Sequence, residues 1–189
     1  MDTKDKDLIR KMGQKAISDD DFNKQLQANV DFMKKYFSEK SRHGFAPQFV
    51  AVNMKHEVVI GLVADLPSDS EERHKMMYAL GRKFKKENDF FPVCIFFLSE
   101  AWMRGQVEKG EKVQLPIRDN PSKTECIVVS GMTLDGRTNM ATIPMARGAH
   151  DVVMLKEPTV TFYEGKQDVM SYILYEFYKG YFEEQKGEK

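Results

Sequence analysis

The 189-residue sequence predicts a single α+β domain, a five- to six-stranded, mainly antiparallel sheet flanked by about three helices. Three segments repeat apolar residues at three- and four-residue steps, which is typical of amphipathic helices. Short apolar runs bounded by turn residues lie between them and indicate strands. No repeat or low-complexity linker divides the chain. One domain over residues 1–189 follows, with 1–17 and 185–189 expected to be flexible ends.

The first strong helix is predicted to begin near Ser18 or Asp19. Either side chain can cap a helix, and the acids that follow suit the positive end of the helix dipole. Gly44 and Pro47 are expected to end the helical segment. The spacing of five apolar residues predicts one buried face: Phe22, Leu26, Val30, Met33 and Phe37.

A hairpin and a second helix come next. Two apolar runs, 49–53 and 58–63, are separated by the turn sequence MKHE, which predicts an antiparallel pair. The sequence SDSE then has the spacing of a capping box, with Ser68 as the cap and Glu71 reaching back to it. The predicted buried side of this helix consists of Met76, Met77, Leu80 and Phe84.

The second half of the chain is predicted to begin with strands. A third strand is expected over 92–98, and two more, over 125–132 and 138–145, flank the dipeptide Asp135-Gly136. That dipeptide is a strong hairpin signal, because both central residues of the favoured turn need positive φ. These two strands are therefore expected to pair with each other.

The chain is predicted to close with an edge strand and a helix. Pro158 interrupts the extended stretch 152–163, which favours an edge strand or two short pieces, since proline has no N–H to donate. The segment 167–184 has the spacing of a helix, with apolar residues at four-residue steps: Val169, Ile173, Phe177 and Tyr181.

Composition excludes several function classes. The 29 acidic and 29 basic residues balance, which argues against a broad attraction to nucleic acid or to an anionic membrane. No apolar run approaches the ~20 residues of a membrane span, and the first residues lack the apolar core of a signal peptide. Cys94 and Cys126 lie in apolar runs, as buried thiols do. A cytoplasmic, reduced protein without membrane contact is expected.

The sequence contains no convincing cofactor or metal motif. The stretch GQVEKGEKV echoes a phosphate-binding loop, but Glu111 stands where the phosphate-binding lysine belongs and its carboxylate repels phosphate. No serine sits in a G-x-S-x-G elbow, and Ser130 and Gly131 are interpreted as a bulge or a strand end. No cofactor and no metal are therefore expected. The four histidines lack metal-ligand spacing: His43, His56, His74 and His150.

A carboxylate pair is the best enzymatic alternative. Asp65 follows the second expected strand and Glu100 the third, with a helical crossover between them. If the two strands run parallel, both acids lie at the same end of the sheet. Two acids there suit a divalent ion, which prefers oxygen ligands. The alternative interpretation is that both are solvated loop acids.

The sequence SEAWMRG marks an abrupt change from apolar to polar residues. Ser99 as a cap and Gly105 as the closing residue predict a short helical turn, with Trp102 covering the end of the sheet. The polar excursion that follows, from Glu100 to Thr124, is longer than most structureless connections, which are often functional at this length.

An interaction surface is the favoured hypothesis. Trp102, Arg104 and Arg118 belong to residue types enriched at binding hot spots, and they predict a protein partner or self-association. Arg137 and Arg147 are further cations for an anionic partner. The interrupted edge near Pro158 is a second surface, ranked lower because proline blunts it. A non-catalytic interaction or regulatory module is thus favoured, and a divalent-ion enzyme is the alternative.

Three short motifs carry a resemblance. The sequences FLSEAWM, IVVSG and DGRT, within roughly residues 49 to 147, are similar to those of a loose group of uncharacterised bacterial proteins. The resemblance implies shared structural elements and no activity. The element order also resembles that of roadblock and profilin-like domains, although the stretch around Pro158 departs from their simplest form. Such a topological analogy does not fix function.

Overall fold

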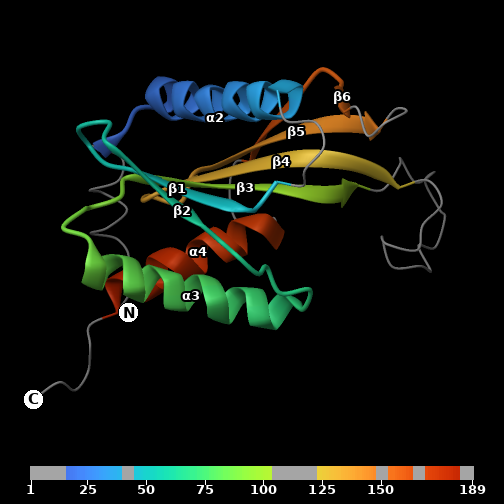
Figure 1. Cartoon of the computed structure of the whole chain (residues 1–189). Helices are drawn as coiled ribbons and strands as arrows, with labels where there is room; N and C mark the ends of the chain where they lie inside the picture. The colour runs from blue at the N-terminus through green and yellow to red at the C-terminus, as the bar shows by residue number, and fades with distance from the viewer. Residues whose placement is uncertain (1–15, 40–44, 104–122, 148–152, 164–168, 184–189) are drawn as a thin grey trace, which may run out of the picture.

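The computed structural model describes residues 16–39, 45–103, 123–147, 153–163 and 169–183. Its elements confirm the predicted α+β class (Figure 1). In chain order they are α2 (Asp19–Glu39), β1 (Gln48–Val52), β2 (Val58–Leu62), α3 (Ser70–Glu87), β3 (Cys94–Met103), β4 (Thr124–Thr133), β5 (Thr138–Arg147), β6 (Val153–Leu155), β7 (Thr159–Tyr163) and α4 (Val169–Phe182).

The strands form one sheet in the order β2-β1-β3-β4-β5-β6, and every described pair is antiparallel. The strand β7 also pairs with β5. Its partners lie at the start of β5, where Thr138 faces Tyr163, whereas β6 pairs at the far end, where Arg147 faces Val153. The stretch around Pro158 thus forms two short strands, as one of the two predicted alternatives has it.

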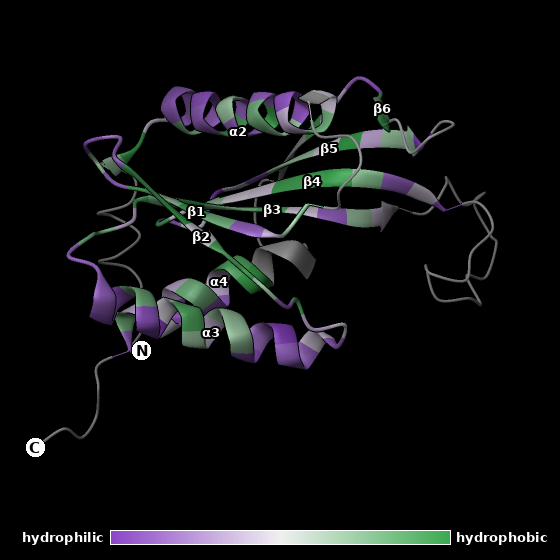
Figure 2. Ribbon diagram, viewed as in Figure 1, coloured by the Kyte–Doolittle hydropathy of each residue, from purple (hydrophilic) through white to green (hydrophobic). Residues whose placement is uncertain are grey.

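Helices cover both faces of the sheet. The helix α2 lies over one face, and α3 and α4 lie side by side over the other (Figure 1). Figure 2 shows the strongly apolar strand β4 enclosed between these layers. The predicted buried face of α2 is confirmed, since all five of its residues are buried against the sheet: Phe22, Leu26, Val30, Met33 and Phe37.

Aromatic rings fill the second core. The ring of Phe177 in α4 lies 4.3 Å from that of Phe49 in β1 and 5.6 Å from that of Phe84 in α3, measured between centroids. The predicted inner face of α4 is confirmed at Ile173, Phe177 and Tyr181, all buried. Offset and edge-to-face aromatic packing of this kind stabilises a core beyond the apolar area that it buries.

Both predicted hairpins are present. The strands β1 and β2 pair from Gln48 opposite Leu62 to Val52 opposite Val58. In the second hairpin, β4 and β5 are joined by a turn in which Gly136 has φ +90°, a backbone conformation that favours glycine.

One helix terminus is confirmed and another is corrected. The hydroxyl of Ser18 accepts the N–H of Asp21 at 3.1 Å, so Ser18 caps α2 as predicted. The cap of α3 is Asp69 rather than Ser68, because the Asp69 carboxylate accepts the N–H of Glu72 at 3.0 Å. An ionised cap also suits the positive end of the helix dipole.

The predicted helical turn beginning at Ser99 is wrong. The strand β3 continues to Met103, with Ser99 opposite Val128 and Trp102 opposite Glu125 in β4. A partner strand of equal length offers a hydrogen-bonding ladder along the whole of β3, and this long-range pairing outweighs a local capping signal. Gly105, the expected end of the turn, lies outside the described residues.

The predicted bulge or strand end at Ser130 and Gly131 is also wrong. Both residues lie within β4 in regular register, opposite Phe97 and Phe96. The ring of Phe96 occupies the space beside Gly131, where a Cβ would approach the ring's Cε1 to 2.6 Å. The glycine is therefore required for close packing inside the sheet.

The ends of the chain are described only in part. Flexible ends are expected over 1–17 and 185–189, and of these residues the structure describes Ala16 and Ile17 alone. Ile17 is buried in the core beneath α2, so the packed part of the chain begins before the helix itself.

Candidate functional site

A group of side chains lies where β3 and β5 end and β4 begins. We call it the Trp102 surface, and it consists of Trp102, Lys123, Glu100, Glu125 and Arg147. Successive side chains of a strand point to opposite faces of the sheet. Glu100 and Trp102 therefore share the face on which earlier even-numbered residues of β3 pack beneath α2. In Figure 1 the tip of β3 extends beyond the C-terminal end of α2. Among the described residues, no helix covers this part of the face.

An arginine between two carboxylates orders the surface. The guanidinium of Arg147 donates to both oxygens of Glu125, from Nε and from Nη2, at 2.8 Å each. Its Nη2 also donates to Glu100 at 3.2 Å. The second oxygen of Glu100 accepts the backbone N–H of Phe45 at 2.5 Å. Two parallel N–H···O bonds fix the orientation of an arginine as well as its position.

The side chains of this network are mostly shielded from water. The exposed fractions are 33% for Arg147, 22% for Glu100 and 18% for Glu125. Partly buried pairs are screened less by salt than pairs on an open surface. Salt therefore screens these ion pairs less than pairs on an open surface. Phe45, whose N–H binds Glu100, packs against Tyr36 with the ring centroids 5.1 Å apart.

Trp102 itself is exposed. Its exposed fraction is 46%, and the ammonium group of Lys123 lies 4.6 Å from the centroid of its ring, a cation–π distance. Trp102 lies within β3 rather than in the predicted helical turn, and its side chain is half-buried. The longer β3 carries the residue past the end of α2, and no helix of the described residues covers it.

The predicted group of arginines is not assembled as expected. Arg104 and Arg118 lie outside the described residues. Arg137 precedes β5 whereas Arg147 ends it, so the two lie at opposite ends of that strand. Arg137 serves the β4–β5 turn instead, where it bonds to Asp135 at 2.9 Å, to Asp19 and to the carbonyl of Ile17 at 2.8 Å.

The two acids of the alternative enzyme hypothesis lie towards the same end of the sheet. The strands β2 and β3 are both antiparallel to β1 and are therefore parallel to each other. Glu100, however, lies within β3 and not after it, and both of its oxygens are engaged. Asp65 is exposed, three residues past the end of β2.

Metal-ligating groups are sparse in the described part of the chain. It holds no cluster of three or more His, Cys, Asp or Glu side chains that suits a metal ion. The Asp65–Glu100 pair remains a prediction.

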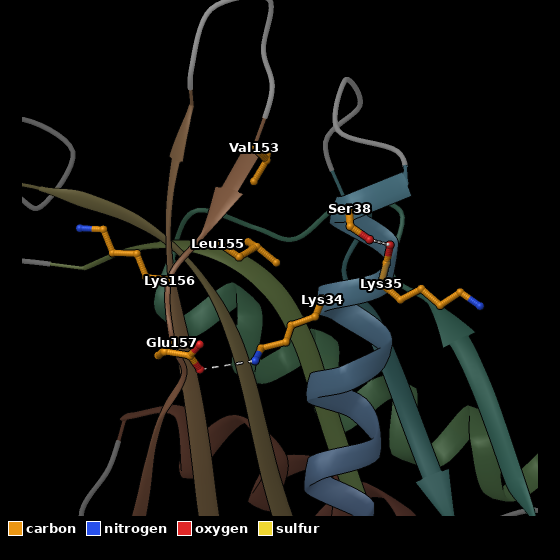
Figure 3. A pocket seen from close by; sticks show the side chains of 7 residues that line it. All are labelled: Lys34, Lys35, Ser38, Val153, Leu155, Lys156 and Glu157. Carbon is orange, nitrogen blue, oxygen red and sulfur yellow. Dashed lines mark hydrogen bonds and ion pairs between the residues drawn. The ribbon is translucent and has the colours of Figure 1, made fainter.

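A pocket of about 440 Å³ lies between the end of α2 and the segment around β6 (Figure 3). In Figure 3 Lys35 and Lys156 point to opposite sides, and Lys34 pairs with Glu157 at 3.8 Å. The three ammonium groups thus do not converge on one anion. The pocket is lined by Lys34, Lys35, Ser38, Val153, Leu155, Lys156 and Glu157.

The two cysteines are buried thiols, as predicted. Burial raises the pKa of Cys94 to about 12, although the charge of Arg137 opposes this. Burial, helped by the charge of Glu125, raises the pKa of Cys126 to about 11. Only a thiolate is an effective nucleophile, so neither cysteine is reactive at neutral pH.

The structure shows a surface that sequence reasoning missed. Three apolar side chains of β2 are exposed, Val58 at 49%, Ile60 at 59% and Leu62 at 71%. They point to the face that carries α2, because their partners Val50 and Val52 belong to that core. The helix α2 packs mainly over β3, β4, β5 and β6, however, and no helix of the described residues packs closely on this face of β2. The sequence signal that could have indicated this surface is the absence of any charged residue in the apolar run 58–62.

Comparisons with known proteins add no relative. Within the described residues, no helix is long and apolar enough to cross a membrane. No family model, no curated protein and no solved structure matches the chain.

Proposed function

We propose that this chain is a non-catalytic protein-interaction or regulatory module that binds a partner protein through the Trp102 surface. One observation carries the proposal: a half-exposed tryptophan stands on a regular strand beside side chains held by ion pairs. Tryptophan and arginine are the residue types most enriched among interface hot spots.

Preorganisation favours binding at this surface. A side chain that is already ordered loses less conformational entropy when a partner covers it. Arg147 is held by Glu125 and Glu100, and Trp102 stands on a strand paired along its whole length. Indole area at the centre, with charged groups around it, matches the apolar core and polar rim of protein interfaces.

The sequence extends this surface with two arginines. Arg104 directly follows β3 in the chain, and Arg118 lies in the same connection between β3 and β4. Loops on a rigid scaffold are common places for recognition. We include both arginines in the proposed surface, where they would favour a partner with acidic groups.

A divalent-ion-dependent enzyme that uses Asp65 and Glu100 is the second candidate. The parallel direction of β2 and β3 favours it, because Asp65 and Glu100 then lie towards the same end of the sheet. The hydrogen bonds of Glu100 to Phe45 and Arg147 count against it, since a metal ion would compete with both.

The test compares three forms of the tagged protein in its native cell: the parent, Trp102→Ala and Tyr175→Ala. Tyr175 is a control of matched exposure, 42%, on α4. We expect the parent and Tyr175→Ala to retain a common partner that Trp102→Ala loses, and binding of that purified partner should weaken at least tenfold. Equal retention by all three forms would exclude the Trp102 surface.

Two further measurements complete the test. Thermal melts should show that Trp102→Ala folds, with a stability loss of about 1–2 kcal/mol, below the 3–5 kcal/mol typical of a fully buried tryptophan. Phosphate-ester hydrolysis that needs Mg²⁺ or Mn²⁺ and is lost in both Asp65→Asn and Glu100→Gln would favour the second candidate instead.

A further inference from the structure

The outer edge of β2 has unpaired backbone groups. In an antiparallel ladder, the N–H and C=O of alternate residues point to opposite sides of the strand. Hydrogen bonds from Asn53 to the Glu57 carbonyl and from Val63 to the Pro47 carbonyl show that odd-numbered residues of this segment face β1. The N–H and C=O groups of Val58, Ile60 and Leu62 therefore point away from the sheet, and no described strand pairs with them.

The same three residues carry the exposed apolar side chains. Val58, Ile60 and Leu62 are 49%, 59% and 71% exposed, on the face that α2 leaves bare beside β1. An open edge with apolar side chains is a template for another strand, and natural proteins usually blunt such an edge with charge, proline or a short strand. The segment Val58–Leu62 contains no charged residue and no proline.

The opposite edge of the sheet has features that discourage pairing with another strand. It is formed by the three-residue β6 and by β7, with Pro158 between them. A proline and a very short strand both discourage pairing. The edge formed by β2 has neither a proline nor a strand as short as β6.

We infer that β2 pairs with β2 of a second copy of this chain, antiparallel, about a two-fold axis that passes beside Ile60. This register sets Ile60 opposite Ile60 of the second copy and Val58 opposite its Leu62. All outward-pointing backbone groups of the three residues then bond, about six hydrogen bonds in total. The inference concerns a surface other than the Trp102 surface and does not rest on the proposed function.

The register also pairs the side chains. On the α2 face, Val58, Ile60 and Leu62 of one copy meet Leu62, Ile60 and Val58 of the other, so the exposed apolar stripe is complementary to itself. Directly opposed apolar side chains stabilise an antiparallel pair. No like charges face each other along the strand, because the segment contains none.

Charges near the two ends of the strand support a second copy as the occupant. Lys55 lies in the turn before β2 and Asp65 lies three residues after β2, and both side chains are exposed. Antiparallel pairing brings the start of one β2 beside the end of the other, so the end that carries Lys55 lies towards the end that carries Asp65 of the second copy. The carboxylate of Glu57, between Lys55 and the strand, already accepts a hydrogen bond from Asn53. Closed two-fold dimers are also the commonest homo-oligomers.

The first test is the oligomeric state, measured by sedimentation over a range of concentrations. We expect the parent to be a dimer and Ile60→Lys to be a monomer that keeps the parent's circular dichroism. Met154→Lys is the matched control, since Met154 is 57% exposed on β6 at the opposite edge, and it should remain dimeric. A monomeric parent, or a dimeric Ile60→Lys, would overturn the inference.

The second test is disulfide trapping with a mild oxidant. Opposed residues of a hydrogen-bonded pair have Cα atoms ~5.5 Å apart, within the range that a disulfide spans. We expect Ile60→Cys to form a disulfide dimer rapidly. The native Cys94 and Cys126 are buried and should not compete. Met54→Cys, 63% exposed in the turn before β2, should remain uncrosslinked.

Trapping also reads the register. Val58→Cys alone should not crosslink, because the two copies of residue 58 would lie about 13 Å apart along the strand. A mixture of Val58→Cys and Leu62→Cys should give the mixed disulfide. Self-crosslinking of Val58→Cys as fast as that of Ile60→Cys, or no disulfide from Ile60→Cys, would overturn the proposed pairing.

Discussion

Gly81 of α3 lies directly against the carbonyl group of Phe177 in α4, so close that a Cβ at position 81 would collide with its oxygen. The contact is reciprocal, since Gly180 of α4 lies in the same way against the carbonyl of Tyr78 in α3. The two helices therefore cross backbone to backbone at a pair of glycines. This close crossing brings the aromatic residues of α4 onto the sheet.

Gly81→Ala should destabilise the protein by about 2 kcal/mol or more. Overpacking typically costs 1–3 kcal/mol, and here the obstacle is backbone, so the helices must separate. That cost exceeds the gain of about 1 kcal/mol in helix propensity. Urea unfolding measures the difference. Gly61→Ala is the control, because nothing lies within 4 Å of its Cβ position, and it should change stability by less than about 0.5 kcal/mol.

Two tyrosines of α4 should respond in opposite ways to loss of the hydroxyl. The hydroxyl of Tyr181 donates to the carbonyl of Phe90 at 2.9 Å, so Tyr181→Phe should cost about 1 kcal/mol. The buried hydroxyl of Tyr178 has no hydrogen-bond partner among the described residues. Tyr178→Phe should therefore leave the free energy of unfolding unchanged or raise it. Equal losses in the two variants would show that Tyr178 has a partner after all.

Local patterns were sufficient for much of the fold. The face of α2 follows from a spacing within one helix, and the Asp135-Gly136 turn follows from the φ angles that its residues tolerate. The helical turn at Ser99 failed for the opposite reason. The state of that residue depends on Val128, its partner across the sheet, and no local signal reports such a partner.

The candidate surfaces depend on which strands the helices cover, and a local sequence pattern does not encode this. The apolar run of β2 reads as a buried strand, yet Ile60 is exposed because α2 packs elsewhere. Trp102 was predicted to lie in a helical turn, but it lies within β3, because the length of β3 is set by its pairing with β4. In both cases the environment of the residue depends on elements that are distant in the sequence.

Alkaline pH should weaken the fold through Cys94. Burial raises the pKa of this thiol from 9.0 to about 12, against the opposing charge of Arg137. A folded-state pKa above the unfolded value gives stability that is complete below pH 9 and is lost as the pH rises from there towards 12. The loss is about 1.4 kcal/mol per pH unit for one group.

Urea unfolding of the parent and of Cys94→Ala measures this effect. The substitution removes the contribution of Cys94 but keeps the other groups that titrate at alkaline pH. The parent should therefore lose stability more steeply above pH 9 than Cys94→Ala does. A constant difference between the two proteins at all pH values would show that the thiol ionises as readily in the folded state as in the unfolded one.

The two proposed surfaces should be separable by substitution. Replacing both Arg104 and Arg118 by Ala should leave thermal stability nearly unchanged and weaken binding of the partner that the Trp102 surface retains, because both arginines belong to the proposed surface, where their charge would attract that partner. The same double variant should sediment as the parent does. Ile60→Lys should show the reverse, a monomer that still binds the partner. If the double arginine variant instead becomes monomeric, the connection between β3 and β4 is the self-association surface, and the assignment of β2 to that role is wrong.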